Sequence, residues 1–176
     1  MSAAPHTSIG GQGTLSVGEL LYGDFPLEHA STRRTLERYP DGKGDWRPHE
    51  RSRSLSQLAT HVADIVNRGV AVLETDGMEL GTRQPVPLLD SAHELLAHFE
   101  TGLTRLNAAL ANVDLDFLAQ PWALRREGRV LIQHPRRILL RQMMMSHLVH
   151  HRAQLGVYYR LLGVPVPGAY GPSADD

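Results

Sequence analysis

Apolar residues recur at intervals of three and four along four stretches of the chain, which is the spacing of the buried face of an α-helix. The clearest stripe lies in the third stretch and consists of Leu95, Phe99, Leu103, Leu106 and Leu110. The second stretch has an apolar face made of Leu58, Val62, Ile65 and Val72. The pattern predicts helices over residues 16–39, 54–76, 91–112 and 135–162.

Most ends of these helices carry a start or stop signal. Three helices open with a capping box, in which a serine and a residue three positions later satisfy each other's free backbone N–H groups. The boxes are Ser16–Glu19, Ser54–Gln57 and Ser91–Glu94. Pro26 lies inside the first helix and predicts a kink or a split near Phe25, because proline removes a backbone donor. Pro135 suits the first turn of the last helix, which ends at Gly163.

Two longer links separate the predicted helices. Residues 76–90 are broken by glycine and proline, and residues 112–135 lack helical periodicity. The short runs on either side of Gly128 predict a small hairpin or, alternatively, an ordered loop. We find no internal repeat and no second domain. The prediction is an all-α fold, a four-helix bundle with a long crossover connection, formed by residues 14–176 after a disordered lead-in of residues 1–13.

Composition excludes several classes of function. The chain has no cysteine, which excludes a thiolate metal site, a cysteine nucleophile and disulfide bonds. Its net charge of −1 and its pI near 6.8 lack the basic character of most nucleic-acid-binding proteins. No apolar run approaches the ~20 residues that span a bilayer. We therefore expect a cytoplasmic protein whose partners are neither nucleic acids nor membranes.

The chain contains ten histidines, and three of them fall in the segment HLVHH. On the last helix, steps of three and four place His147 and His151 on one face. The other members of that face are Leu140, Met144, Gln154 and Tyr158. The two imidazoles interrupt an apolar seam one turn apart and can reach one metal ion, although such a pair alone is more often a structural or surface feature. His61, near the apolar face of the second helix, can reach inward to the same ion.

The remaining histidines and polar neighbours allow more than one role. His150 is rotated by about 60° from His147 and about 100° from His151, so we expect it beside the ligands or at an interface. We expect Asp64 either to orient the N–H of a ligand or to lie in solvent. We expect Gln154 either to face the metal cavity or to hydrogen-bond across the bundle. Surface or hydrogen-bonded positions are expected for His6, His29, His49, His93, His98 and His134.

Two segments, DWRPHERSRSLSQLATHVADI (residues 45–65) and HLVHHRAQLGVYYRLLGVPVPGAYGPSADD (residues 147–176), resemble the DinB family of the DinB/YfiT-like superfamily. The likeness runs from Leu15 onward and is most specific in HLVHHRAQ and in the closing VPxxYGPSAD. The family's metal ligands are one histidine of the second helix and an HxxxH pair of the last helix. The resemblance therefore implies His61, His147 and His151 as ligands of one divalent ion, which is zinc, nickel or iron. It also implies a four-helix bundle with a long crossover and a homodimer packed through helices.

The resemblance extends to activity, because characterised members of the superfamily include bacillithiol S-transferases and a mycothiol-dependent isomerase. We expect a metal-dependent enzyme of the thiol S-transferase type, whose small-molecule partner is a low-molecular-weight thiol such as bacillithiol. Three nitrogen ligands leave positions open on the ion, and coordination favours the reactive thiolate. One alternative is a metal-dependent hydrolase, for which the sequence offers no convincing general acid or base. The other is a non-catalytic stress-response protein with a structural or sequestered metal.

Overall fold

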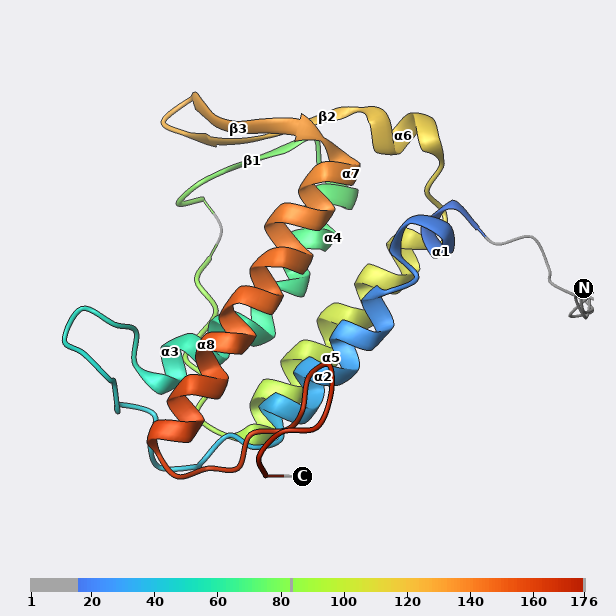
Figure 1. Ribbon diagram of the computed structural model, residues 1–176. Helices are drawn as coiled ribbons and strands as arrows, with labels where there is room; N and C mark the ends of the chain where they lie inside the picture. Colours follow the sequence, from blue (N-terminus) through green and yellow to red (C-terminus); the bar gives the residue numbers. More distant parts are fainter. Residues whose placement is uncertain (1–15, 83, 176) are drawn as a thin grey trace, which may run out of the picture.

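The computed structural model describes residues 16–82 and 84–175, so the predicted lead-in of residues 1–13 lies outside the described part. The described chain is mostly helical, as predicted, with a small sheet at one end of the helices (Figure 1). Four helical stretches run side by side, and each contacts two of the others.

None of the described helices is long and apolar enough to cross a membrane. In chain order the elements are α1 (Val17–Tyr22), α2 (Phe25–Leu36), α3 (Leu55–Asp64), α4 (Val66–Glu74), β1 (Gly77–Glu79), α5 (Ala92–Leu110), α6 (Leu115–Ala119), β2 (Pro121–Arg126), β3 (Arg129–Pro135), α7 (Arg136–Leu139), the π-helix η1 (Leu140–Ser146) and α8 (His147–Leu161).

The predicted capping boxes mark where the first three helical stretches begin. The boxes before α1 and α3 form both of their hydrogen bonds. The third box forms only in part, because Ser91 Oγ accepts from the Glu94 N–H whereas the Glu94 carboxylate accepts from the N–H of Asp90. The predicted split in the first stretch is confirmed between α1 and α2, with Pro26 in the first turn of α2. The second stretch is interrupted at Ile65, which separates α3 from α4.

The sheet corrects the all-α prediction. The hairpin, one of the two alternatives for the second link, is present as β2 and β3, which pair antiparallel. Its turn residues, Glu127 and Gly128, have φ angles of 51° and 75°, as a two-residue hairpin turn requires. β1 pairs in parallel with β2 and was missed, because a strand of three residues is too short to show an alternating pattern. Trp122 of β2 is buried, and its indole N–H donates to the Thr75 hydroxyl at 3.1 Å, which joins the sheet to the end of α4.

The last helical stretch contains a π-helix, η1, that the sequence did not predict. A π-helix carries extra residues relative to the α-helical repeat, so the faces that follow it are displaced. The buried residues of α8 are Leu148, Arg152, Leu155 and Tyr159. Each lies one residue after a member of the predicted seam, as a one-residue insertion requires. The prediction that His147 and His151 interrupt the apolar seam is therefore wrong, since both are half-buried at its edge.

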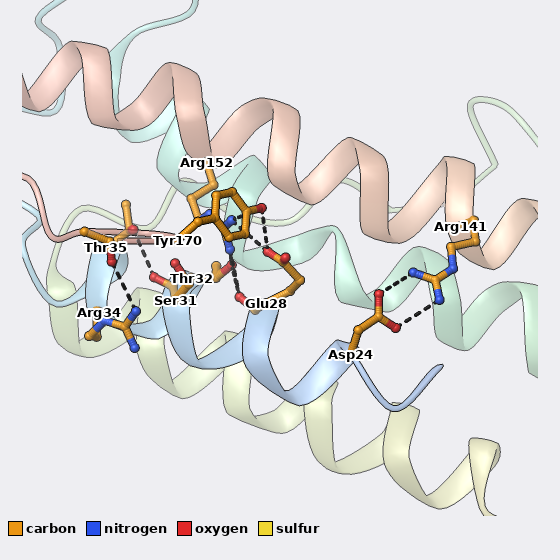
Figure 2. A network of polar contacts seen from close by, with 10 residues as sticks. Asp24, Glu28, Ser31, Thr32, Arg34, Thr35, Arg141, Arg152 and Tyr170 are labelled. Carbon is orange, nitrogen blue, oxygen red and sulfur yellow. Dashed lines mark hydrogen bonds and ion pairs between the residues drawn. The ribbon is translucent and has the colours of Figure 1, made fainter. Parts of the chain in front are cut away.

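A buried polar network joins α2, α8 and the segment that follows α8 (Figure 2). The Arg152 guanidinium is 5% exposed and donates to the Glu28 carboxylate at 2.7 Å, to the Glu28 carbonyl oxygen at 2.9 Å and to the Thr32 hydroxyl at 3.3 Å. The Tyr170 hydroxyl accepts from Arg152 at 2.9 Å and donates to the Glu28 carboxylate at 3.1 Å. The network therefore holds the C-terminal segment against the helices.

Candidate metal centre

Three imidazole rings from two helical stretches meet at one point. His61 comes from α3, and His147 and His151 come from successive turns of α8. His61 Nε2 lies 3.1 Å from His147 Nε2, and one ring nitrogen of each of the three residues lies within 4.8 Å of the others. Two nitrogens bound to a tetrahedral zinc ion at about 2.0–2.1 Å are separated by about 3.3 Å. The three rings, called the triad below, thus have a spacing that fits ligands of a single ion.

Hydrogen bonds orient two of the three rings. His151 Nδ1 lies 2.7 Å from Gln154 Oε1, so the amide oxygen accepts the Nδ1 proton. His147 donates to the backbone carbonyl oxygen of Met143, a residue of η1. A neutral imidazole has one protonated nitrogen, so each bond leaves a lone pair on the other nitrogen of its ring. Gln154 therefore contacts a triad ring on its own helix, and it lines a hollow together with His151, which agrees with the first of the two roles expected from the sequence.

Burial keeps the three rings uncharged. Removal from solvent lowers the pKa of His61 to about 3 and that of His147 to about 4, and it also lowers the pKa of His151. Positive charges act in the same direction, led by Arg53 for His61 and by Arg68 for His147. At neutral pH the triad is therefore unprotonated, which is the form of imidazole that binds a metal.

Two polar residues next to the triad have defined surroundings. Asp64 Oδ1 lies 2.9 Å from His98 Nε2 and accepts from the Asn67 amide at 3.1 Å. His98 is therefore hydrogen-bonded, as expected, whereas a contact between Asp64 and a ligand ring stays a prediction. His150 is exposed, and its ring centroid is 4.8 Å from that of His151, so it lies beside the triad.

The remaining histidines follow the sequence expectation with one exception. Three are exposed, as expected: His49, His93 and His134. His6 lies outside the described residues. His29 is 5% exposed and packs edge-on against Phe25 and Phe99, and its Nε2 has no hydrogen-bond partner in the described part of the chain. The expectation of a surface or hydrogen-bonded position is wrong for His29, because its ring packs as an aromatic core residue.

Two hollows border the triad. The first has a volume of about 450 Å³, and its lining includes His61, Asp64 and Arg53. The second has a volume of about 380 Å³, and its lining includes His151, Tyr158 and again Arg53. A small molecule in either hollow would lie against a triad residue. Sequence analysis missed Arg53, because an arginine one residue before a capping box belongs to no motif.

Comparisons with known proteins bear on the family and the fold of the chain. The sequence profile of the DinB family matches residues 16–176, whereas no curated protein matches the chain. Among solved structures, a DinB-like protein from Bacillus cereus has a TM-score of 0.66 and 21% identity, covering 86% of this chain and 97% of its own. A DinB-like protein from Bacillus subtilis has a TM-score of 0.62 and 20% identity, covering 83% and 96%. A protein described as a DinB family member, from Exiguobacterium sibiricum, has a TM-score of 0.63 and 19% identity, covering 93% and 99%.

At these identities the solved structures show likeness of fold alone, while the profile spans nearly the whole described chain. The match of the profile carries the family assignment. The chain belongs to the DinB family.

Proposed function

We propose that the chain binds one divalent metal ion through His61, His147 and His151 and that the ion activates the thiol of a small molecule for transfer to an electrophile. The observation that carries this proposal is the make-up of the triad. It offers three imidazole nitrogens, and within the described residues no further histidine or carboxylate belongs to the group. Structural zinc usually has four protein ligands, so an ion with three has room for an outside molecule.

A thiol suits this site because a thiolate is a ligand that the chain itself cannot supply, having no cysteine. When bound, a divalent ion lowers the pKa of a thiol that reaches it, and the thiolate is the nucleophilic form. The imidazole ligands suit zinc, nickel or iron. In the transfer, the thiol proton leaves to solvent, the sulfur forms a bond to a carbon of the electrophile, and the leaving group departs with its bonding electrons.

The chain's own residues would hold the ion and orient the rings that bind it. His61, His147 and His151 would bind the ion, while Gln154 and the Met143 carbonyl fix two of the rings through their outer nitrogens. The two hollows give the thiol and the electrophile separate approaches to the triad. Because their linings share Arg53, the two reactants would be neighbours when both are bound.

Metal content and thiol chemistry test the proposal together. Tag-free protein should contain about one equivalent of zinc, nickel or iron, and the His147→Ala/His151→Ala variant should contain less than about a tenth of that. His150→Ala, which changes the exposed neighbour of the pair, should retain the metal. The metal-loaded protein should then accelerate conjugation of bacillithiol or another small thiol to an electrophile. Equal metal in wild type and the double variant, or no turnover across a broad thiol panel, would refute the corresponding half of the proposal.

Hydrolysis is the second candidate, and one observation favours it. Asp64 lines the same hollow as His61 and is hydrogen-bonded to His98, so its carboxylate could take a proton from water in that hollow. A divalent ion lowers the pKa of water as it does that of a thiol. Turnover of esters or amides without a thiol, lost in Asp64→Asn with metal content unchanged, would favour hydrolysis over transfer.

We also propose that the helices form a four-helix bundle with a crossover, because each helical stretch packs against two others and the longest link carries the hairpin of β2 and β3. The homodimer stays a prediction, and light scattering of the purified protein would check it.

A further inference from the structure

Arg53 is an exposed residue beside the triad. It lines both hollows, the one bordered by His61 and the one bordered by His151. Arg51, two residues earlier and also exposed, lines neither hollow. A molecule that reaches the triad through either hollow therefore passes Arg53.

The backbone of Arg53 is held from two sides. Its carbonyl oxygen accepts from the Tyr158 hydroxyl of α8 at 3.2 Å, and the Tyr158 ring packs edge-on against Trp46 with a centroid distance of 5.5 Å. The next residue, Ser54, caps α3 with both hydrogen bonds of its capping box. Arg53 is thus fixed relative to the two helices that carry the triad.

The guanidinium of Arg53, in contrast, forms no hydrogen bond or ion pair with any residue that the structure describes. Arginines that do pair with a carboxylate are common in this chain, and they are Arg33, Arg105, Arg136, Arg141, Arg152 and Arg160. Solvent satisfies the exposed guanidinium of Arg53 in the free protein. The guanidinium is therefore available to a molecule that enters either hollow, and the fixed backbone keeps Arg53 at the junction of the two hollows.

The charge around the hollows favours an anion. Three neutral imidazoles leave the charge of a divalent ion uncompensated, and Arg53 adds another positive charge. Among the described lining residues of both hollows, Asp64 is the one carboxylate, and it is engaged with His98 and Asn67. The planar guanidinium presents two parallel N–H groups, which match the two oxygens of a carboxylate.

We infer that Arg53 binds a carboxylate of the small molecule that occupies the hollows, so that the substrates of this site are carboxylate-bearing compounds. The inference rests on the proposed function insofar as the same molecule reaches the triad. It adds a substrate class and a specificity-determining residue that lies outside the metal ligands.

Succinate is the probe that tests the carboxylate site without a thiol. Calorimetric titration of the metal-loaded protein at low ionic strength should show binding of succinate, and binding of the neutral succinamide should be at least about tenfold weaker. Arg53→Gln should weaken succinate binding by about tenfold or more, whereas Arg51→Gln should change it by less than about twofold. Wild-type protein that does not bind succinate, or equal affinity in Arg53→Gln, would overturn the inference. So would an equal loss in Arg51→Gln, which would indicate a general effect of surface charge.

A second titration separates this inference from the proposed function. Metal content should be the same in Arg53→Gln as in wild type. Wild type should bind mercaptosuccinate, which carries carboxylates, more tightly than 2-mercaptoethanol, which carries none. Arg53→Gln should bind 2-mercaptoethanol like wild type but lose the preference for mercaptosuccinate. If neither thiol reaches the metal while succinate still depends on Arg53, the transferase proposal fails and the carboxylate site stands. If both thiols reach the metal with equal affinity in wild type, the carboxylate site fails and the transferase proposal stands.

Discussion

His151 and Arg152 follow one another on α8 and enter two different polar environments. Arg152 is 5% exposed, and its guanidinium is surrounded by acceptors from Glu28, Thr32 and Tyr170 (Figure 2). His151 is half-buried, and its side chain hydrogen-bonds to Gln154, on the same helix. The first environment joins three segments of the chain, whereas the second brings ring nitrogens toward one another.

The two environments differ in how completely their polar atoms are supplied with partners from the chain. A buried charge is tolerated when its partners are complete, and the Arg152 network supplies a carboxylate, a carbonyl and two hydroxyl groups. In the triad, His61 Nε2 and His147 Nε2 face each other at 3.1 Å, and both rings are kept neutral by burial. Neutral ring nitrogens that converge in this way can share an added cation. The first arrangement stabilises the fold, and the second is suited to a ligand.

The largest effect is expected from breaking the Arg152 network. Arg152→Met leaves the half-buried Glu28 carboxylate without its charged partner, with only the Tyr170 hydroxyl, among the described residues, still bonded to it. Loss of one member of a buried pair costs about 3–5 kcal/mol of the free energy of unfolding. The control is Arg105→Met, which breaks an exposed pair with Glu74 and should cost at most about 1 kcal/mol. Urea denaturation in the presence of a chelator measures both variants without a contribution from metal. Equal losses would show that the Arg152 network contributes no more than a surface ion pair.

His29 combines a feature of each environment, since it is buried like Arg152 and uncharged like the triad. Burial lowers its pKa to about 4, so in acid the unfolded chain takes up a proton at this residue before the folded chain does. The associated stability is present above the unfolded pKa of about 6.5 and is lost as the pH falls toward about 4. The loss attributable to His29 between pH 7 and pH 5 is about 2 kcal/mol.

The variant His29→Phe keeps an aromatic ring between Phe25 and Phe99 and removes the titration. Its free energy of unfolding, measured in chelator, should fall less steeply between pH 7 and pH 5 than that of wild type. Parallel pH profiles would contradict the assignment. Because the triad is present in both proteins, its own titration cancels in the difference.

Sequence patterns identified what depends on local chemistry. The capping boxes at Ser16 and Ser54 located helix starts. The predicted stripe is buried from Leu95 to Leu106, and its last member, Leu110, is partly buried. The hairpin around Gly128 was foreseen as one of two alternatives because its turn needs residues with positive φ. These features are decided by neighbours within a few residues along the chain.

The position of the seam on α8 could not be predicted in the same way. Met143, Met144 and Met145 are all buried in η1, so no polar residue among them reveals the shift of register. The histidine pair was identified from its spacing, which the shift leaves intact, but its place at the edge of the seam was not. Arg53 was missed for a related reason, since its value comes from two hollows that exist only in the folded chain.

The smallest expected effect comes from the single hydrogen bond that orients His151. Gln154→Leu removes the acceptor of the Nδ1 proton, and loss of such an outer partner should weaken metal affinity by about tenfold while the unfolding free energy of the chelated protein hardly changes. Competition with a chromophoric chelator measures the affinity, and Gln142→Leu, at an exposed position of η1, is the matched control. A Gln154 variant that binds metal as tightly as this control would mean that α8 alone orients the His151 ring. A loss of metal affinity without a loss of unfolding free energy would show that the orientation of His151 contributes to metal binding and not to stability. Its neighbour Arg152, in contrast, would contribute to the stability of the fold.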